Sequence, residues 1–301
     1  MKRLLFLIAF MVLIAQSSCV GTRKLNYVRE SLAAMKETDS TEEKEIYGLK
    51  NISEKKIREG KIDSLNGGRI RKKIFSYEGE AAYYRKKADS LAVLLTDKAA
   101  FRKQYRKTVL PALAMLRDYY KRSKERISLY LIIEDGLNIA NYHQYDLAAF
   151  FGPGKYTIPP EMAGSAEASF EPLIDSLVLF ANKYSGKKRT VSLVILGFAD
   201  GTGFSNTSPL TAALKQLMGT NGASREEMNR KLSELRAEEI CKQLVALYYK
   251  RSAAFADREN LKIEYNYQGK GEVYPQPNIK DYVTDDPRRR IVLCYWLVLP
   301  D

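Results

Sequence analysis

Side chains that commonly perform catalysis are few and scattered in this sequence of 301 residues. Its only histidine, His143, lies in a tyrosine-rich stretch. A Ser-His-Asp hydrolase, a Cys-His pair or a histidine zinc site would each need it together with suitable partners. We expect His143 to be a partly buried aromatic side chain. The adjacent acids Asp285 and Asp286 precede Pro287 in a predicted loop, where carboxylates are usually solvated, so they do not indicate a glycosidase. We therefore expect no catalytic site, no metal site and no cofactor.

Four short motifs in the second half of the chain carry more specific chemistry. They are GFADGTG at 197–203, NRKLSELRA at 229–237, GKGE at 269–272 and DPRRRI at 286–291. The first motif follows a predicted strand and is rich in glycine. It is neither a GxGxxG sequence that opens a helix nor a GxxxxGK[ST] phosphate loop. Each motif alone is a weak signal, whereas four in this order, on the ends of predicted elements, form a fairly specific pattern.

Together the four motifs resemble those of the OmpA-like peptidoglycan-binding domain. This family occurs in outer-membrane porin tails, peptidoglycan-associated lipoproteins and MotB-type flagellar stator subunits. The resemblance covers about residues 150–301. It implies an α+β fold of two layers with the element order β-α-β-α-β-β, and non-catalytic, non-covalent binding of peptidoglycan.

The resemblance also assigns a binding pair, Asp200 and Arg236. In the family, the matching residues hold the zwitterionic end of diaminopimelate in the peptidoglycan stem peptide. A carboxylate accepts hydrogen bonds from an ammonium group, and a guanidinium offers a planar fork to a carboxylate. Ordinary roles stay open, because Asp200 can cap a turn and Arg236 can form a surface ion pair. The same motifs supply the other expected site residues, Thr202, Asn229, Arg289 and Arg290.

The sequence departs from the family pattern in three places. Phe198 and Ala199 replace the His and Thr that precede the aspartate, and Arg288 stands where the family has Asn. The spacing between Asp200 and Arg236, 35 residues, is longer than usual. The excess lies at about 204–224 and includes a predicted helix, Pro209–Met218. This insertion can act as a lid, change selectivity or block the site.

The N-terminus resembles a lipoprotein signal. Three residues with two positive charges precede the apolar stretch Leu4–Ala15, which is shorter than the roughly 20 residues of a membrane-spanning helix. We expect 1–18 to be a signal peptide and Cys19 to be the lipidated first residue of the mature chain. Gln16 stands where such signals usually have Leu, and an ordinary signal peptide with a coincidental cysteine is the alternative. The implied location is the outer membrane, anchored by acyl chains such as palmitate and facing the periplasm.

The two later cysteines, Cys241 and Cys294, allow two interpretations. An exported protein meets an oxidising compartment, in which the two thiols can pair. Free cysteines also pack as small hydrophobic side chains. We expect two separate buried thiols.

The net charge of +13 falls to about +11 when Lys2 and Arg3 leave with the leader. Such a charge often indicates nucleic acid, which an exported protein rarely meets. We expect no nucleic-acid partner. Diffuse attraction to anionic lipid headgroups and cell-wall polymer suits the charge better. The basic cluster Arg102–Arg126 is expected to be the solvated face of helices, and contact with membrane or wall is the alternative.

The first half of the chain is expected to be a spacer. Residues 19–69 are polar and predict a partly helical tether, with a turn at Asn66-Gly67-Gly68. Residues 70–149 predict a helical bundle or hairpin that Pro111 interrupts. Its apolar residues recur at intervals of four and three, as in Tyr77, Ala81, Tyr84, Ala88, Leu91 and Leu95. This region is where a protein partner in the envelope would bind.

Strands and helices alternate after Gly152-Pro153-Gly154. β-branched apolar runs predict strands, and apolar residues at helical spacing predict amphipathic helices. The expected elements are a strand at Lys155–Ile158, a helix at 170–181, and then Thr190–Phe198 (strand), Met228–Tyr249 (helix), Leu261–Tyr267 (strand) and Arg290–Leu299 (strand). The leading expectation is a lipoprotein that anchors the outer membrane to peptidoglycan. The alternative is a scaffold of the same fold that binds a protein and not peptidoglycan.

Overall fold

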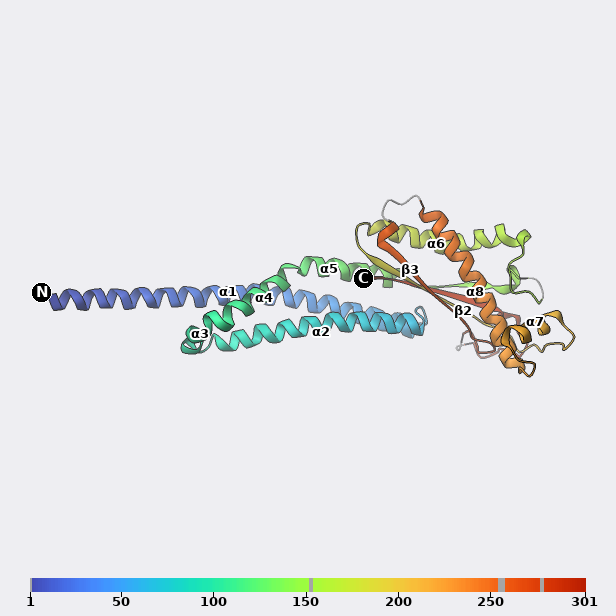
Figure 1. Ribbon diagram of the computed structural model, residues 1–301, viewed down its shortest axis with the longest axis horizontal. Coiled ribbons are helices and arrows are strands. Elements are labelled where there is room, and N and C mark those ends of the chain that lie inside the picture. Colours follow the sequence, from blue (N-terminus) through green and yellow to red (C-terminus); the bar gives the residue numbers. More distant parts are fainter. Residues whose placement is uncertain (1, 152–153, 254–257, 277–278) are drawn as a thin grey trace. The chain divides into compact units, whose positions relative to one another are not determined.

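The computed structural model describes residues 2–151, 154–253, 258–276 and 279–301, without the side chains of 2–20, 147, 181 and 258. It forms two compact units (Figure 1). The helical unit contains the chain up to Asn51 and Arg71–Leu131, and the sheet unit contains Ile52–Ile70 and Ile132–Asp301. None of the helices in the described part of the chain is both long and apolar enough to cross a membrane.

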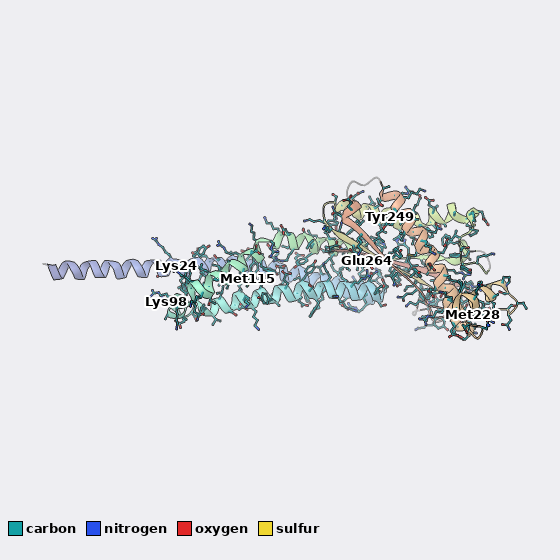
Figure 2. The ribbon with its side chains drawn as sticks, viewed as in Figure 1. Lys24, Lys98, Met115, Met228, Tyr249 and Glu264 are labelled. Atoms are coloured by element: carbon teal, nitrogen blue, oxygen red, sulfur yellow. The ribbon has the colours of Figure 1, made fainter. Side chains whose placement is uncertain are left out.

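Helices build the helical unit. They are α1 (Lys2–Arg58), α2 (Ser64–Leu94), α3 (Lys98–Gln104), the π-helical segment η1 (Tyr105–Val109), α4 (Leu110–Lys121) and α5 (Ser123–Ile139). The last turns of α1 and α5 and the first turns of α2 belong to the sheet unit. Pro111 lies in the first turn of α4, directly after the π-helical segment, so the expected interruption is confirmed. Lys24 of α1 and Lys98 of α3 lie at the same end of the unit (Figure 2).

Helix α1 is continuous, which corrects the expectation of intermittent helix before residue 60. Its inward face repeats every three or four residues, as in a heptad pattern. The residues on this face are Leu25, Val28, Leu32, Met35, Asp39, Glu42, Ile46 and Leu49. Two of the eight are acids, so a search for apolar residues alone misses part of this heptad repeat. Of the stretch 19–69 that we expected to be a tether, 25–49 is part of the core of the helical unit, and 52–69 belongs to the sheet unit.

The buried acid Glu42 is neutralised by side chains from two other helices. Arg126 donates hydrogen bonds to Oε1 at 2.6 Å and to Oε2 at 2.8 Å. The Tyr130 hydroxyl donates to Oε1 at 2.7 Å, and the Tyr119 hydroxyl to Oε2 at 3.3 Å. Burial acts to raise the pKa of Glu42, but these donors together hold the pKa below its ordinary value. Glu42 is therefore a buried anion with a full set of donors.

The turn that we expected at Asn66-Gly67-Gly68 is not there, because these residues lie inside α2. The chain turns before them, where Gly60 takes φ +69°. Asp63 then accepts hydrogen bonds from the backbone N–H groups of Leu65 and Asn66 and so caps α2. A Cβ at Gly67 would lie 3.3 Å from Ile57, so this glycine allows α1 and α2 to approach closely. Asn-Gly-Gly serves helix packing in this chain.

A four-stranded mixed sheet is the centre of the second unit. Its strands are β1 (Tyr142–Asp146), β2 (Arg189–Gly197), β3 (Leu261–Gly269) and β4 (Ile291–Pro300), in the order β1-β4-β2-β3. Strands β2 and β3 are parallel, and β4 runs antiparallel to β1 and β2. The main helices are α6 (Ala163–Lys183), α7 (Pro209–Met218) and α8 (Arg225–Ser252). The expected α+β class, helical N-terminal region and last three strands are confirmed.

The first strand is not where we expected it. Lys155–Ile158 is irregular, and β1 is formed by the tyrosine-rich segment before residue 150. Strand β1 pairs with the edge of β4 from Tyr142↔Tyr295 to Asp146↔Ile291. Two prolines follow Ile158, and proline cannot donate a ladder hydrogen bond. The composition change at Gly152-Pro153-Gly154 includes 152 and 153, which lie outside the described residues.

Helices α6 and α8 pack over one face of the sheet (Figure 1). On the other face, Arg69 from the start of α2 donates a 2.6 Å hydrogen bond to Ser192 Oγ and lies 3.2 Å from a carboxylate oxygen of Glu264. Cys241 on α8 and Cys294 on β4 are buried free thiols, as expected. Burial raises the pKa of Cys241 to about 12, so this thiol is unreactive.

Helix α8 lies directly against the ends of β2 and β3, where two paired glycines meet it. A Cβ at Gly197 would be 2.1 Å from the backbone oxygen of Ser233, and a Cβ at Gly269 would be 2.1 Å from that of Arg230. The buried Ser233 hydroxyl accepts a 3.0 Å hydrogen bond from the N–H of Gly271. Gly271 itself has φ +57°. Three of the four motifs are therefore parts of one helix–sheet contact.

Replacing Gly197 by Ala is expected to destabilise the sheet unit by about 1–3 kcal/mol, because α8 must move away from the strand ends. Gly269→Ala is expected to have a similar effect. Chemical denaturation measures the free energy of unfolding. Gly164→Ala is the matched control, since a Cβ there contacts nothing within 4 Å and alanine favours helix. Equal stability of the Gly197 and Gly164 variants would contradict the proposed close packing.

Candidate functional site

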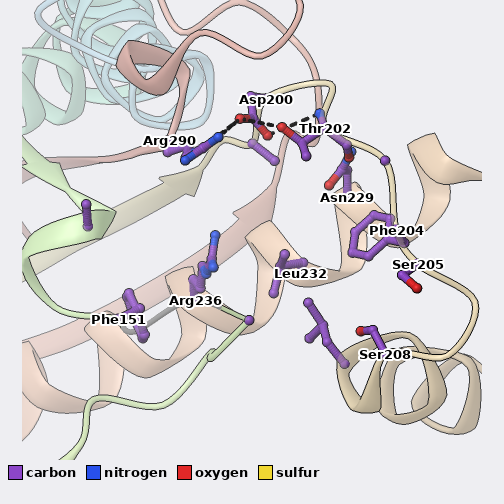
Figure 3. A pocket seen from close by; sticks show the side chains of 15 residues that line it. Phe151, Asp200, Thr202, Phe204, Ser205, Ser208, Asn229, Leu232, Arg236 and Arg290 are labelled. Carbon is purple, nitrogen blue, oxygen red and sulfur yellow. Dashed lines mark hydrogen bonds and ion pairs between the residues drawn. The ribbon is translucent and has the colours of Figure 1, made fainter.

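A pocket of about 550 Å³ opens where β2 ends beside the first half of α8 (Figure 3). Its walls come from five segments: the chain after β1, the end of β2, the insertion, α8 and the residue directly before β4. Five of the six expected site residues line it, namely Asp200, Thr202, Asn229, Arg236 and Arg290. The sixth, Arg289, does not. The structure thus brings together side chains that are far apart in the sequence.

Asp200 is the buried carboxylate of the pocket. Its Oδ1 accepts a 3.3 Å hydrogen bond from the backbone N–H of Thr202, and its Oδ2 accepts a 2.9 Å bond from the Thr202 hydroxyl. Arg290 donates to Oδ2 at 2.5 Å. The expected turn-capping role is therefore present, together with an ion pair. Since Oδ2 has two donors and Oδ1 has one weak donor, Oδ1 has capacity for another.

Arg236 is half-buried on the opposite side of the pocket and points toward the Asp200–Arg290 pair (Figure 3). Its Nε donates to the backbone oxygen of Lys155 at 3.1 Å, and its guanidinium carbon lies 5.7 Å from the centre of the Phe151 ring. Among the described side chains, no carboxylate forms an ion pair with it. Burial, with repulsion from Arg290, lowers its pKa to about 10, and Asp200 opposes this only partly. Lys155 and Phe151 thus position the Arg236 guanidinium, which has no ion-pair partner among the described side chains.

Thr202 and Asn229 belong to a hydrogen-bond network at the rim. The Asn229 amide donates to the backbone oxygen of Thr202 at 3.4 Å and to Glu272 Oε1 at 2.9 Å. Arg225 donates to both carboxylate oxygens of Glu272 at 3.0 Å. The network joins α8 to the loop after β3. It fixes the position of Asn229 beside the turn that holds Asp200.

Arg289 lies behind the pocket and organises the loop between β3 and β4. It is buried, and it donates to the backbone oxygens of Thr284 at 2.8 Å, Val283 at 3.2 Å and Glu272. Its guanidinium carbon is 4.8 Å from the centre of the Tyr274 ring. Thr284 in turn accepts a hydrogen bond from the N–H of Gly201, next to Asp200. Arg289 therefore braces the site and does not face a ligand.

The insertion forms one wall of the pocket. Its lining residues are Phe204, Ser205, Ser208 and Leu210. The expected helix at Pro209–Met218 is present, capped by Ser208 and ended by Gly219 at φ +64°. Leu214 packs on Met228 and Leu232 of α8, so the helix is fixed to the domain. Since the pocket remains open beside it, the insertion neither fills nor closes the site.

Several site residues were missed by the sequence analysis. Phe151 directly precedes Gly152-Pro153-Gly154, and no motif indicated it. Glu272 was quoted only as part of GKGE, although the capping box of Ser224 and Glu227 marks a helix start that brings Arg225 close to it. Asp286 was expected to be solvated, but it is buried and accepts hydrogen bonds from Arg288, which lower its pKa to about 2.

The other candidates for chemistry do not form a site. His143 is half-buried on β1, as expected, and burial lowers its pKa. Within the described ranges, no group of three or more His, Cys, Asp or Glu side chains is arranged to hold a metal ion. The expected lipidation residue, Cys19, has a side chain outside the described part of the structure.

Comparisons with known proteins give a limited result. Neither a protein-family model nor a curated protein matches this sequence. Several solved structures are similar, including the following two. A MotB-like protein from Desulfovibrio vulgaris has 16% identity over 53% of this chain and 75% of its own, with a TM-score of 0.27. The cell wall anchor of the T6SS from Pseudomonas aeruginosa has 13% identity over 56% of this chain and 96% of its own, with a TM-score of 0.25.

The two charged residues of the pocket are expected to differ in their effect on stability. Asp200→Asn leaves Arg290 and Arg236 without a carboxylate and should cost about 1–2 kcal/mol, a modest figure because Arg290 is partly exposed. Arg236→Met removes a cation that repels Arg290 and should change stability by less than about 1 kcal/mol. Urea denaturation measures both values. A larger loss for Arg236→Met than for Asp200→Asn would mean that Arg236 is a structural residue.

Proposed function

We propose that the pocket binds the stem peptide of peptidoglycan, without catalysis. The observation that carries this proposal is the position of Arg236, a half-buried cation held by Lys155 and Phe151 and facing Asp200 across an open pocket. A partly desolvated cation that has no ion-pair partner among the described side chains is costly, so its retention favours a ligand with a carboxylate. The four motifs resemble the OmpA-like family, and residues of three of them line this pocket, which supports the same ligand.

The pocket chemistry suits the zwitterionic end of diaminopimelate. The Arg236 guanidinium offers its remaining N–H groups to the carboxylate of the ligand. The ammonium group of the ligand can donate to Asp200 Oδ1, which now has one long hydrogen bond. The wall made by Phe204, Leu210 and Leu232 can contact the aliphatic part of the ligand. Each end of the site has a separate task.

We also propose that Cys19 carries acyl chains which hold the protein in the outer membrane, facing the periplasm. The support is the short apolar stretch Leu4–Ala15 followed by small residues and a cysteine. One acyl chain of myristoyl size gives only marginal membrane binding, so a stable anchor requires several chains or a second attachment. With this anchor and the pocket, the protein would hold the outer membrane to peptidoglycan.

A scaffold that binds another envelope protein is the second candidate. The observation that favours it is a set of exposed apolar side chains on α2, among them Phe75, which is 73% exposed, and Val93, which is 70% exposed. Exposed apolar groups often mark protein interfaces when they form a patch. This candidate uses the helical unit and does not need the pocket.

The proposed site predicts a loss of peptidoglycan binding in two variants. Asp200→Ala and Arg236→Ala are each expected to weaken binding about tenfold or more, because each removes a charge-assisted contact. The measurement is co-sedimentation of the chain with isolated peptidoglycan. Lys242→Ala is the matched control, since Lys242 is an exposed cation on the same helix that pairs with Glu238 outside the pocket.

The outcomes of this experiment separate the two candidates. Retention of binding by both pocket variants would refute the site, even if the chain binds peptidoglycan elsewhere. Failure of the unaltered chain to co-sediment would remove the anchor proposal and favour the scaffold. Denaturation of the Arg236→Ala variant, expected to match the unaltered chain, shows that any loss of binding does not come from unfolding.

The lipidation proposal predicts that Cys19→Ser abolishes incorporation of a labelled fatty acid in cells. Cys241→Ser is the control and should keep the label, because that thiol is buried in the sheet unit. Fractionation of the same cells should show the Cys19 variant released from the membrane. Continued labelling of Cys19→Ser would exclude this residue as the acylated one.

A further inference from the structure

One end of the helical unit carries a concentrated positive charge. It combines the first turns of α1 after residue 20 with α3 and the π-helical segment. The exposed basic side chains, here called the basic tip, are Arg23, Lys24, Lys98, Arg102, Lys103, Arg106 and Lys107. No Asp or Glu occurs at 19–29 or 98–117. No acidic residue within these two segments can therefore neutralise the positive charge of the basic tip.

Contacts between the two segments show that the tip is one surface. A Cβ at Gly21 would lie 3.3 Å from Nε of Arg102, and Lys24 Nζ is 4.9 Å from the centre of the Tyr105 ring. Beneath them, Leu25 and Phe101 belong to one buried apolar cluster. The basic groups of α1 and of 98–107 are thus held side by side by packing.

The charge of the tip is not neutralised within the molecule. In the described structure, none of its seven basic side chains forms an ion pair. The nearest acid in sequence, Asp97, is occupied as the cap of α3, where it accepts from the N–H groups of Ala99 and Ala100 at 2.8 and 3.0 Å. Clustered like charges repel one another, so an external anionic surface would stabilise this arrangement.

We propose that the basic tip binds the anionic phospholipid headgroups of the membrane that holds the lipid anchor. This proposal rests on the proposed lipidation of Cys19, which determines how far the basic tip lies from the membrane. Residue 21 is only two residues beyond Cys19, a rise of about 3 Å along a helix. An acylated Cys19 therefore places the tip at the headgroup layer, where anionic lipid is at a high effective concentration and peptidoglycan is not. Each basic residue near such a surface contributes about 1 kcal/mol.

The tip would supply the second attachment that acyl chains alone lack. It would also hold the helical unit against the membrane surface at a defined end. Arg102 and Lys24 contact the fold as well as the surface, whereas Lys103, Arg106 and Lys107 project from it without a partner among the described residues. These three are the side chains to change.

Vesicle sedimentation tests the proposal with the mature chain carrying Cys19→Ser, which has no acyl groups. The chain is expected to bind vesicles of equal parts phosphatidylglycerol and phosphatidylcholine, not vesicles of phosphatidylcholine, and to be released by high salt. Changing Lys103, Arg106 and Lys107 to Glu should weaken binding at least about tenfold. The control changes Lys44, Lys72 and Lys124 to Glu, an equal change of net charge on exposed residues away from the tip.

Several results would overturn the proposal. Equal binding to both vesicle types, absence of binding, or an equal loss in the control would each exclude a local lipid site. If the tip variant loses binding to isolated peptidoglycan but keeps binding to vesicles, the tip contacts the wall instead.

A variant with Gln at the same three positions, which keeps the polar surface, should show an intermediate loss. Peptidoglycan binding by the tip variant is expected to be unchanged, so this test is independent of the pocket.

Discussion

Helix α8 can lie across the ends of β2 and β3 only because both strands end in glycine. The contact leaves no room for a side chain at Gly197 or Gly269. Close approach sets the position of every α8 residue in the pocket, since Asn229 and Arg236 are on the same rigid helix as Ser233. Asp200 follows Gly197 by three residues. The carboxylate and the guanidinium therefore meet at one pocket because two backbones touch, even though the insertion separates them in sequence.

The pocket holds two guanidinium groups and one buried carboxylate. Arg290 forms the ion pair with Asp200, so Arg236 is the charge in excess, and burial together with repulsion from Arg290 lowers its pKa. Folding alone would favour a neutral side chain at this position. In the proposed function, the unbalanced cation is the group that binds the ligand's carboxylate, and the bound anion would recover the cost of burial. Arg236 would then favour binding at the expense of local stability, whereas Asp200 would favour both.

Most of the sheet unit could be predicted from the sequence, because β2 is rich in β-branched residues, β3 alternates, β4 is largely apolar, and the main helices have apolar stripes. The helix at Pro209–Met218 was also predicted, and the structure adds Ser208 as its N-cap and Gly219 as its end. The first strand was missed because β1 is polar and tyrosine-rich and depends on pairing with β4. Five residues of the pocket were named from the motifs, whereas Phe151 was not, because its role depends on a tertiary contact with Arg236. Long-range contacts leave no local pattern.

The prediction of a partly helical tether for the first part of α1 was wrong for a different reason. Two of the core positions of this helix are acids, so its sequence looked too polar for a buried face. Asp39 and Glu42 are acceptable in the core only where Arg85 and Arg126 reach them, at 2.8 and 2.6 Å. A shift of α1 by one heptad would separate these pairs and leave buried charges, which costs far more than a lost apolar contact. The acids therefore fix the register of α1 against the other helices. That register brings 98–107 beside 21–24, so the basic tip depends on the two salt bridges of Asp39 and Glu42 in the same unit.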